Sequence, residues 1–148
     1  MAFEVLTWDL STRLCSVSLS ILIHIFSIVI FLDWDDTLFP SSYLASNGYR
    51  LDSTSINSDI LKELKEVEHW VGQLLELLTT KADVYIVTNA ETGWVELSAA
   101  KFIPALAAKV GAMEVVSART KYETLFPESP FKWKVCIFNI NNHQLSSS

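Results

Sequence analysis

Three short apolar runs in this sequence end in polar residues, and each predicts a buried strand. Residues 28–32 are apolar and rich in β-branched side chains, and they lead directly into a stretch with three carboxylates, residues 33–37. Residues 83–90 show the same pattern, with an apolar centre that ends in Thr88 and Asn89. A third run follows at residues 113–116. Short runs of this composition are typical of strands buried in a parallel sheet.

Longer segments between these runs carry the spacing of helices. Residues 57–79 place apolar side chains three and four positions apart, which predicts one amphipathic helix with Asn57 or Ser58 at its start. Residues 91–109 predict a second helical region, which Pro104 should break or kink. The apolar face of the first helix consists of Ile60, Leu61, Leu64, Val67, Val71, Leu74, Leu75 and Leu78.

The order strand, helix, strand, helix, strand indicates an α/β fold with a mostly parallel sheet and helices on its faces. In such sheets the polar groups at the carboxyl ends of neighbouring strands come together, and this edge is where ligands bind. Asp33 and Asp35 are two positions apart, so on an extended backbone their carboxylates would point the same way. Charge after a buried strand is costly unless a metal ion or hydrogen-bond donors compensate it. The alternative is a structural Asp-rich turn.

The pattern Asp33-x-Asp35-x-Thr37 after an apolar strand resembles the first motif of the haloacid dehalogenase-like (HAD) phosphohydrolase superfamily. The resemblance implies that Asp33 is the nucleophile that forms an aspartyl-phosphate, and that Asp35 is the general acid and base. Thr37 would orient the turn next to the substrate. The family also uses Mg²⁺, which Asp33 and Asp35 would bind here, so that the carboxylates and the substrate phosphate do not repel each other.

Two further family motifs have counterparts here. A strand that ends in Thr88 is similar to the second motif, in which the hydroxyl holds the phosphoryl oxygens, and Asn89 would help to orient the group. These residues can equally cap the following helix, whose N-terminus is itself suited to anions. For the third motif, a lysine that neutralises the nucleophile and phosphate, Lys134 is the first candidate and Lys132 the second. A solvated surface lysine is the alternative.

Four phrases are more specifically similar to a group of uncharacterised HAD-like proteins of protists and other microbial eukaryotes. These phrases start at Phe31, Thr88, Ser117 and Phe126. The resemblance covers residues 28 to about 138. It implies a three-layer sandwich around a mostly parallel, Rossmann-like sheet, with a phosphorylated molecule as substrate.

The sequence departs from the family after Lys134. A fourth motif, with one or two further acids for the magnesium ion, is expected there, but no Asp or Glu follows Glu128. We therefore expect an incomplete, C-terminally truncated HAD-like core over residues 28–148. The alternative function is a catalytically inactive HAD-like fragment that binds partners or is a remnant of a truncated gene.

Residues 1–27 form an apolar extension ahead of this core. The run from Leu14 to Leu32 lacks Asp, Glu, Lys and Arg and has the length of a membrane span, but it contains His24 and several serines. A membrane anchor is thus the alternative to a buried element. Residues 40–55 are polar and turn-rich and predict a small cap loop beside the site.

Composition narrows the functional classes. Half of the 148 residues are hydrophobic and the net charge is −6, which predicts a folded domain without the basic patch that nucleic acid needs. Cys15 and Cys136 are far apart and do not have the spacing of a metal site. These features favour a cytoplasmic location, with membrane association as the alternative.

Overall fold

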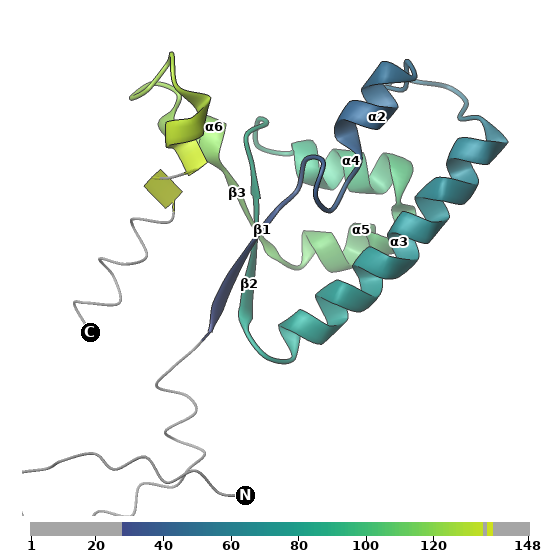
Figure 1. The fold of residues 1–148 in the computed structure, drawn as a ribbon, viewed down its shortest axis with the longest axis horizontal. Coiled ribbons are helices and arrows are strands. Elements are labelled where there is room, and N and C mark those ends of the chain that lie inside the picture. The colour runs from purple at the N-terminus through teal and green to yellow at the C-terminus, as the bar shows by residue number, and fades with distance from the viewer. Residues whose placement is uncertain (1–27, 135, 138–148) are drawn as a thin grey trace, which may run out of the picture.

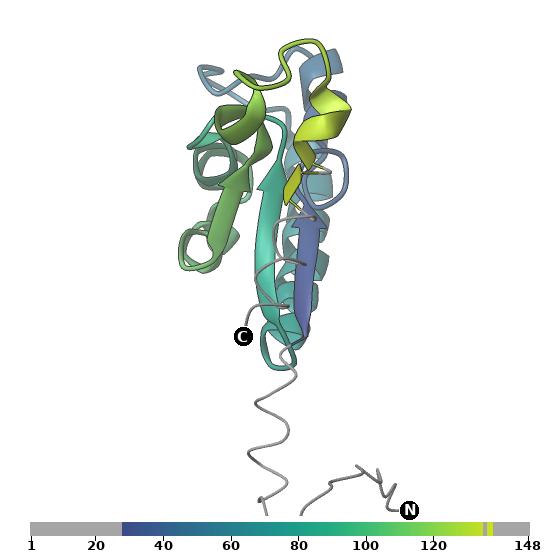
Figure 2. The same cartoon turned by 90° about the vertical axis from the view of Figure 1, so that its left-hand side faces the viewer.

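The computed structural model describes residues 28–134, 136 and 137 and shows a mixed α/β fold. A parallel sheet has the order β1-β2-β3, formed by β1 (Val29–Asp33), β2 (Asp83–Thr88) and β3 (Glu114–Ser117). The three strands run in one direction, with their carboxyl ends at the same edge (Figure 2). The predicted parallel sheet is thereby confirmed for these strands.

The helices lie in two groups, one on each side of the sheet (Figure 1). Four of them share one side: α2 (Ser41–Ser46), α3 (Ser58–Thr79), α4 (Trp94–Phe102) and α5 (Pro104–Gly111). The other side carries α6 (Ala118–Tyr122) and a helical segment at residues 130–134 and 136–137.

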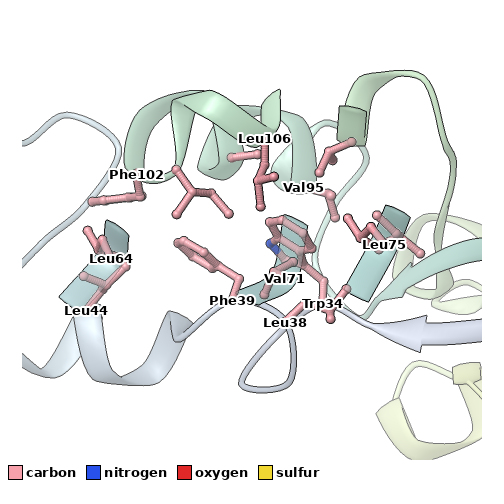
Figure 3. Packing of buried hydrophobic residues seen from close by; sticks show 14 residues of the cluster. Trp34, Leu38, Phe39, Leu44, Leu64, Val71, Leu75, Val95, Phe102 and Leu106 are labelled. Atoms are coloured by element: carbon pink, nitrogen blue, oxygen red, sulfur yellow. The ribbon is translucent and has the colours of Figure 1, made fainter. Parts of the chain in front are cut away.

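Alternation along the strands explains the two groups, because successive strand residues point to opposite faces of a sheet. In β2, Ile86 belongs to the larger core under α3, α4 and α5, whereas Val87 belongs to the smaller core with Tyr122 and Trp133. Figure 3 shows the larger core, in which Trp34 and Phe39 lie among side chains of the surrounding helices.

The predicted helix at residues 57–79 is confirmed as α3. Its cap is Asn57, whose side-chain oxygen accepts a hydrogen bond from the backbone N–H of Asp59 at 2.8 Å. The predicted break is also present, because α4 ends at Phe102 and α5 begins at Pro104. Proline has no backbone N–H to continue a helix, but it is well suited to the first turn of a new one.

The expected cap loop differs from the structure in one respect, because it contains the short helix α2. The buried side chain of Leu44 anchors this helix to the core. The Tyr43 hydroxyl also donates a hydrogen bond to Glu63 of α3 at 2.8 Å, and this bond raises the pKa of Tyr43. The side chains of Leu44 and Tyr43 therefore fix the position of this otherwise polar segment.

Of the apolar run 14–32, residues 29–32 belong to β1, and residues 14–27 lie outside the described residues. Among the described helices, none combines the length and the apolar character that crossing a membrane requires.

Candidate active site

The first carboxylate of the motif, Asp33, is the last residue of β1. Its two oxygens accept hydrogen bonds from the ammonium group of Lys134, at 2.7 and 2.6 Å. The two residues are 101 positions apart, and the helical segment at residues 130–134 brings them together across the carboxyl edge of the sheet. Such a pair combines charge attraction with two charge-assisted hydrogen bonds.

Of the two candidate lysines, it is Lys134 that contacts Asp33. The ammonium group of Lys132 instead lies 5.5 Å from the centre of the Phe126 ring. Arg119, another cation near this edge, pairs with Glu123 at 3.1 Å and with Glu91 at 3.9 Å. The hydrogen bond to Glu123 raises the pKa of the Arg119 guanidinium.

The second carboxylate, Asp35, lies beyond the end of β1. The backbone there leaves the strand and turns, so that Asp35 forms an isolated bridge with Phe39. The expectation that Asp33 and Asp35 share one extended backbone is therefore wrong, since the strand ends between them. Asp35 and Lys134 line one hollow, and Asp33 is connected to it through its contact with Lys134.

Two donors hold Asp35. The Thr88 hydroxyl donates a hydrogen bond to Asp35 Oδ2 at 2.6 Å, and Trp94 Nε1 donates one to Asp35 Oδ1 at 2.9 Å. Thr88 ends β2 and is almost fully buried, and Trp94 is the first residue of α4. The carboxylate is thus fixed from two neighbouring elements at once.

The Thr88 hydroxyl has a second contact, because it accepts a hydrogen bond from the backbone N–H of Ala90 at 2.9 Å. Its single hydrogen is directed to Asp35 in this arrangement. The Thr88 hydroxyl thus contacts both Asp35 and the turn after β2, but the alternative role as a cap of the following helix is wrong, because the N-cap of α4 is Gly93.

Asn89 lines the hollow beside Asp35, Trp94 and Lys134, and its Oδ1 is buried without a hydrogen-bond partner among the described residues. Buried polar atoms are normally paired, so this oxygen is, within the described part of the chain, an acceptor that still lacks a donor. The hollow has a volume of about 490 Å³.

Thr37 is the one predicted site residue that the structure places elsewhere. It lines a different hollow, with Asp36, Glu63 and Glu66, on the other side of the turn. Its backbone N–H lies 3.4 Å from the Trp34 carbonyl oxygen, so its contribution to the turn is made by the main chain.

The sequence analysis missed Asp36. This residue has a positive φ of 57°, and its carboxylate accepts hydrogen bonds from the backbone N–H and the hydroxyl of Ser42 and from the hydroxyl of Ser41. The hydrogen bonds from Ser42 lower the pKa of Asp36. Aspartate tolerates the left-handed region better than most residues and often caps turns, and that is the signal that was available.

The donor set is compatible in kind with a magnesium ion, which prefers oxygen ligands and keeps several waters. Asp33 uses two hydrogen bonds, and a carboxylate offers about four lone-pair positions, so it can still bind a cation. Among the described residues, no three His, Cys, Asp or Glu side chains form a group that could hold a metal. A cation here would depend on water and on a substrate phosphate for its remaining ligands.

Comparison of the chain with protein-family models, with curated proteins and with solved structures gives no match.

Proposed function

We propose that this chain is a HAD-like phosphohydrolase that cleaves phosphate monoesters through an aspartyl-phosphate on Asp33. The observation that carries the proposal is the contact between Asp33 and Lys134 at the edge where Asp35 and Thr88 also meet. A carboxylate nucleophile paired with a cation, and a second carboxylate that lines the same hollow as that cation, are groups that a covalent phosphoryl transfer needs.

In the first step, a carboxylate oxygen of Asp33 attacks the phosphorus atom, and the bond between phosphorus and the ester oxygen breaks. Asp35 in its protonated form gives its proton to the departing oxygen, so that an alcohol leaves. In the second step, Asp35 takes a proton from a water molecule, which attacks the phosphorus. The bond between phosphorus and the Asp33 oxygen breaks, so that inorganic phosphate leaves, the Asp33 carboxylate is restored and Asp35 is protonated again.

Lys134 supplies positive charge in both steps. Phosphate and carboxylate are both anionic, so their approach needs a cation that is already in position. Lys134 lies in contact with Asp33 and lines the hollow in which the phosphoryl group would sit. Mg²⁺, held by Asp33 and Asp35, would add electrostatic stabilisation of the phosphoryl oxygens when it is bound.

Thr88 connects the two protonation states of Asp35. Its hydroxyl donates a hydrogen bond to Asp35 Oδ2 at 2.6 Å. This bond can persist while Asp35 is protonated, because a carboxyl group keeps acceptor positions, and the acidic hydrogen then stays available for the departing oxygen.

The decisive experiment measures hydrolysis of 4-nitrophenyl phosphate with and without magnesium. We expect turnover that depends on magnesium in the wild-type chain and is lost in Asp33→Asn. Asp83→Asn is the matched control, because Asp83 is the exposed first residue of β2, at the opposite end of the strand from the site.

If circular dichroism shows that the wild-type chain is folded and no turnover is found, the phosphohydrolase proposal is wrong. The chain would then be an inactive HAD-like domain.

A further inference from the structure

A second hollow, with a volume of about 390 Å³, lies between α2 with its following loop and α4. Four aromatic rings line it, those of Phe39, Tyr49, Trp94 and Phe102. In Figure 1, α2 and α4 are close together on one side of the sheet, beyond the carboxyl end of β1. Figure 3 shows Phe39 and Phe102 near each other in the adjoining core.

Trp94 joins this hollow to the candidate active site, because it lines both of them. Its Nε1 atom faces Asp35, the proposed proton donor for the departing oxygen. The leaving group of the substrate is attached to that oxygen, so it would lie on the Asp35 side of the phosphoryl group. The ring-lined hollow therefore shares a lining residue with the hollow of the candidate active site.

The lining indicates the chemistry of the occupant. Pockets of roughly 300–1,000 Å³ with mostly apolar walls take small organic ligands, and a few polar groups orient them. Aromatic rings are attracted to other rings in stacked or edge-to-face arrangements. Here the polar residues include Ser41 at the start of α2, and Arg50 and Asp52 in the loop after α2.

The hollow that Thr37 lines fits this role poorly. It carries three carboxylates, Asp36, Glu63 and Glu66, which would repel a phosphorylated molecule. It also shares no lining residue with the hollow that contains Asp35 and Lys134. The ring-lined hollow carries one carboxylate, Asp52, together with the cationic Arg50, and it shares Trp94 with the hollow of the candidate active site.

We infer that the ring-lined hollow binds the leaving group of the substrate, and that this group is an apolar ring system. The substrate class is then a phosphate monoester of an aromatic or otherwise ring-bearing alcohol. This inference rests on the proposed phosphohydrolase function and names its substrate class. The ring stays bound in the hollow while the ester bond to phosphorus breaks and the alcohol oxygen takes the proton of Asp35.

The test compares two primary-alcohol esters, 2-naphthylmethyl phosphate and ethyl phosphate, so that the departing oxygen is chemically similar in both. The wild-type chain should hydrolyse the naphthyl ester with a kcat/KM higher by at least about tenfold, the size of effect that hydrophobic pockets give. Ala45→Trp, which fills the hollow from the exposed side of α2, should bring the ratio close to one.

Ser46→Trp is the matched control. It adds the same side chain to the next residue of α2, which does not line the hollow, and it should leave the ratio at the wild-type value. A wild-type ratio near one would overturn the inference, as would an equal loss of selectivity in both tryptophan variants.

A binding measurement separates this inference from the proposed function. Titration calorimetry with 2-naphthylmethylphosphonate and methylphosphonate needs no turnover. Tighter binding of the naphthyl compound to the wild-type chain, lost in Ala45→Trp, supports the hollow even if no ester is hydrolysed. Equal binding of the two phosphonates overturns it even if esters are hydrolysed.

Discussion

Trp94 Nε1 donates a hydrogen bond of 2.9 Å to Asp35 Oδ1, although 59 residues separate the two in sequence. Asp35 follows β1 and Trp94 begins α4, so this bond ties the turn after the first strand to the helix after the second. With Thr88 on the other oxygen, the proposed acid and base has both oxygens held.

Trp94→Phe should therefore impair proton transfer, because phenylalanine keeps a ring but lacks the N–H. A positioned acid or base contributes roughly 10²- to 10⁴-fold, so partial misplacement should lower kcat/KM for ethyl phosphate about tenfold. For 4-nitrophenyl phosphate the loss should be smaller, since nitrophenolate leaves without a proton. We compare kcat/KM because it reports only the steps up to formation of the aspartyl-phosphate. The rate at which that intermediate is hydrolysed does not affect it.

Trp70→Phe is the control for this variant, because Trp70 is a largely exposed tryptophan on α3. It should behave like the wild-type chain with both substrates. If Trp94→Phe slows both substrates by the same factor, Trp94 does not act through the proton-transfer step.

Thr88→Val should cost both stability and activity, because valine keeps the shape of threonine without the hydroxyl. Asp35 loses a donor and the N–H of Ala90 loses its acceptor. An unpaired buried polar group costs about 1–3 kcal/mol, so the free energy of unfolding in urea should fall by that amount. Thr88→Ser retains the hydroxyl and should stay closer to the wild-type chain in both measurements.

Lys134→Met should lower kcat/KM for 4-nitrophenyl phosphate on the order of 10²-fold, as expected when a preorganised charge is removed. Lys132→Met is the matched control, because the Lys132 ammonium lies over the Phe126 ring instead of at Asp33. Equal activity of the two variants would contradict the role given to Lys134.

The buried hydrogen bond from Trp34 Nε1 to Ser98 Oγ, 3.0 Å long, should contribute measurably to the free energy of unfolding. Ser98→Ala leaves the indole N–H of a fully buried tryptophan without its acceptor and should lower the free energy of unfolding by about 1–3 kcal/mol. In Trp34→Phe the same Ser98→Ala change should cost less. A double-mutant cycle that gives no coupling would contradict this pairing.

Asp36 should make the free energy of unfolding depend on pH in the acidic range. Its pKa is lowered in the folded chain by the hydrogen bonds from Ser42, so its contribution to stability is present above the ordinary value of 3.8 and is lost as the pH falls below it. Asp36→Ala should reduce stability at pH 7 by about 1 kcal/mol, as for the loss of a helix cap. It should also flatten the pH dependence below pH 4.

Unfolding in urea at pH 7 and at pH 3 measures both effects. Asp36→Gly separates two causes, because glycine accepts the positive φ but makes no side-chain hydrogen bond. If the pH dependence of Asp36→Ala equals that of the wild-type chain, the hydrogen bonds from Ser42 do not favour the charged form.

The elements that the sequence predicts well are those fixed by nearby residues. The apolar face of α3, its Asn57 cap and the break before Pro104 each depend on residues within a few positions of one another. The parallel direction of the strands was predictable because helices alternate with them along the chain.

The details of the site depend on contacts between distant residues, and these cannot be read from spacing. Nothing near Trp94 in sequence indicates a bond to Asp35, since the meeting of β1 and β2 in register produces it. The extended path on which Asp33 and Asp35 were expected to align ends at Asp33, the last residue of β1, where the chain enters the turn that holds Asp35. The short helix α2 also depends on a distant partner, Glu63, and on burial of Leu44.

The pair Asp33–Lys134 has a consequence for folding, because it joins the first described strand to the last described helical segment. Among the described residues of that segment, the buried side chains that pack in the smaller core are those of Trp133 and Ile137. A phosphate analogue bound between Asp33 and Lys134 would bind only the assembled form, so its binding energy adds to the stability of that assembly. At a ligand concentration 100 times Kd this linkage is worth about 2.7 kcal/mol, and a bound anion would then act as a reversible cross-link between β1 and the helical segment at residues 130–134.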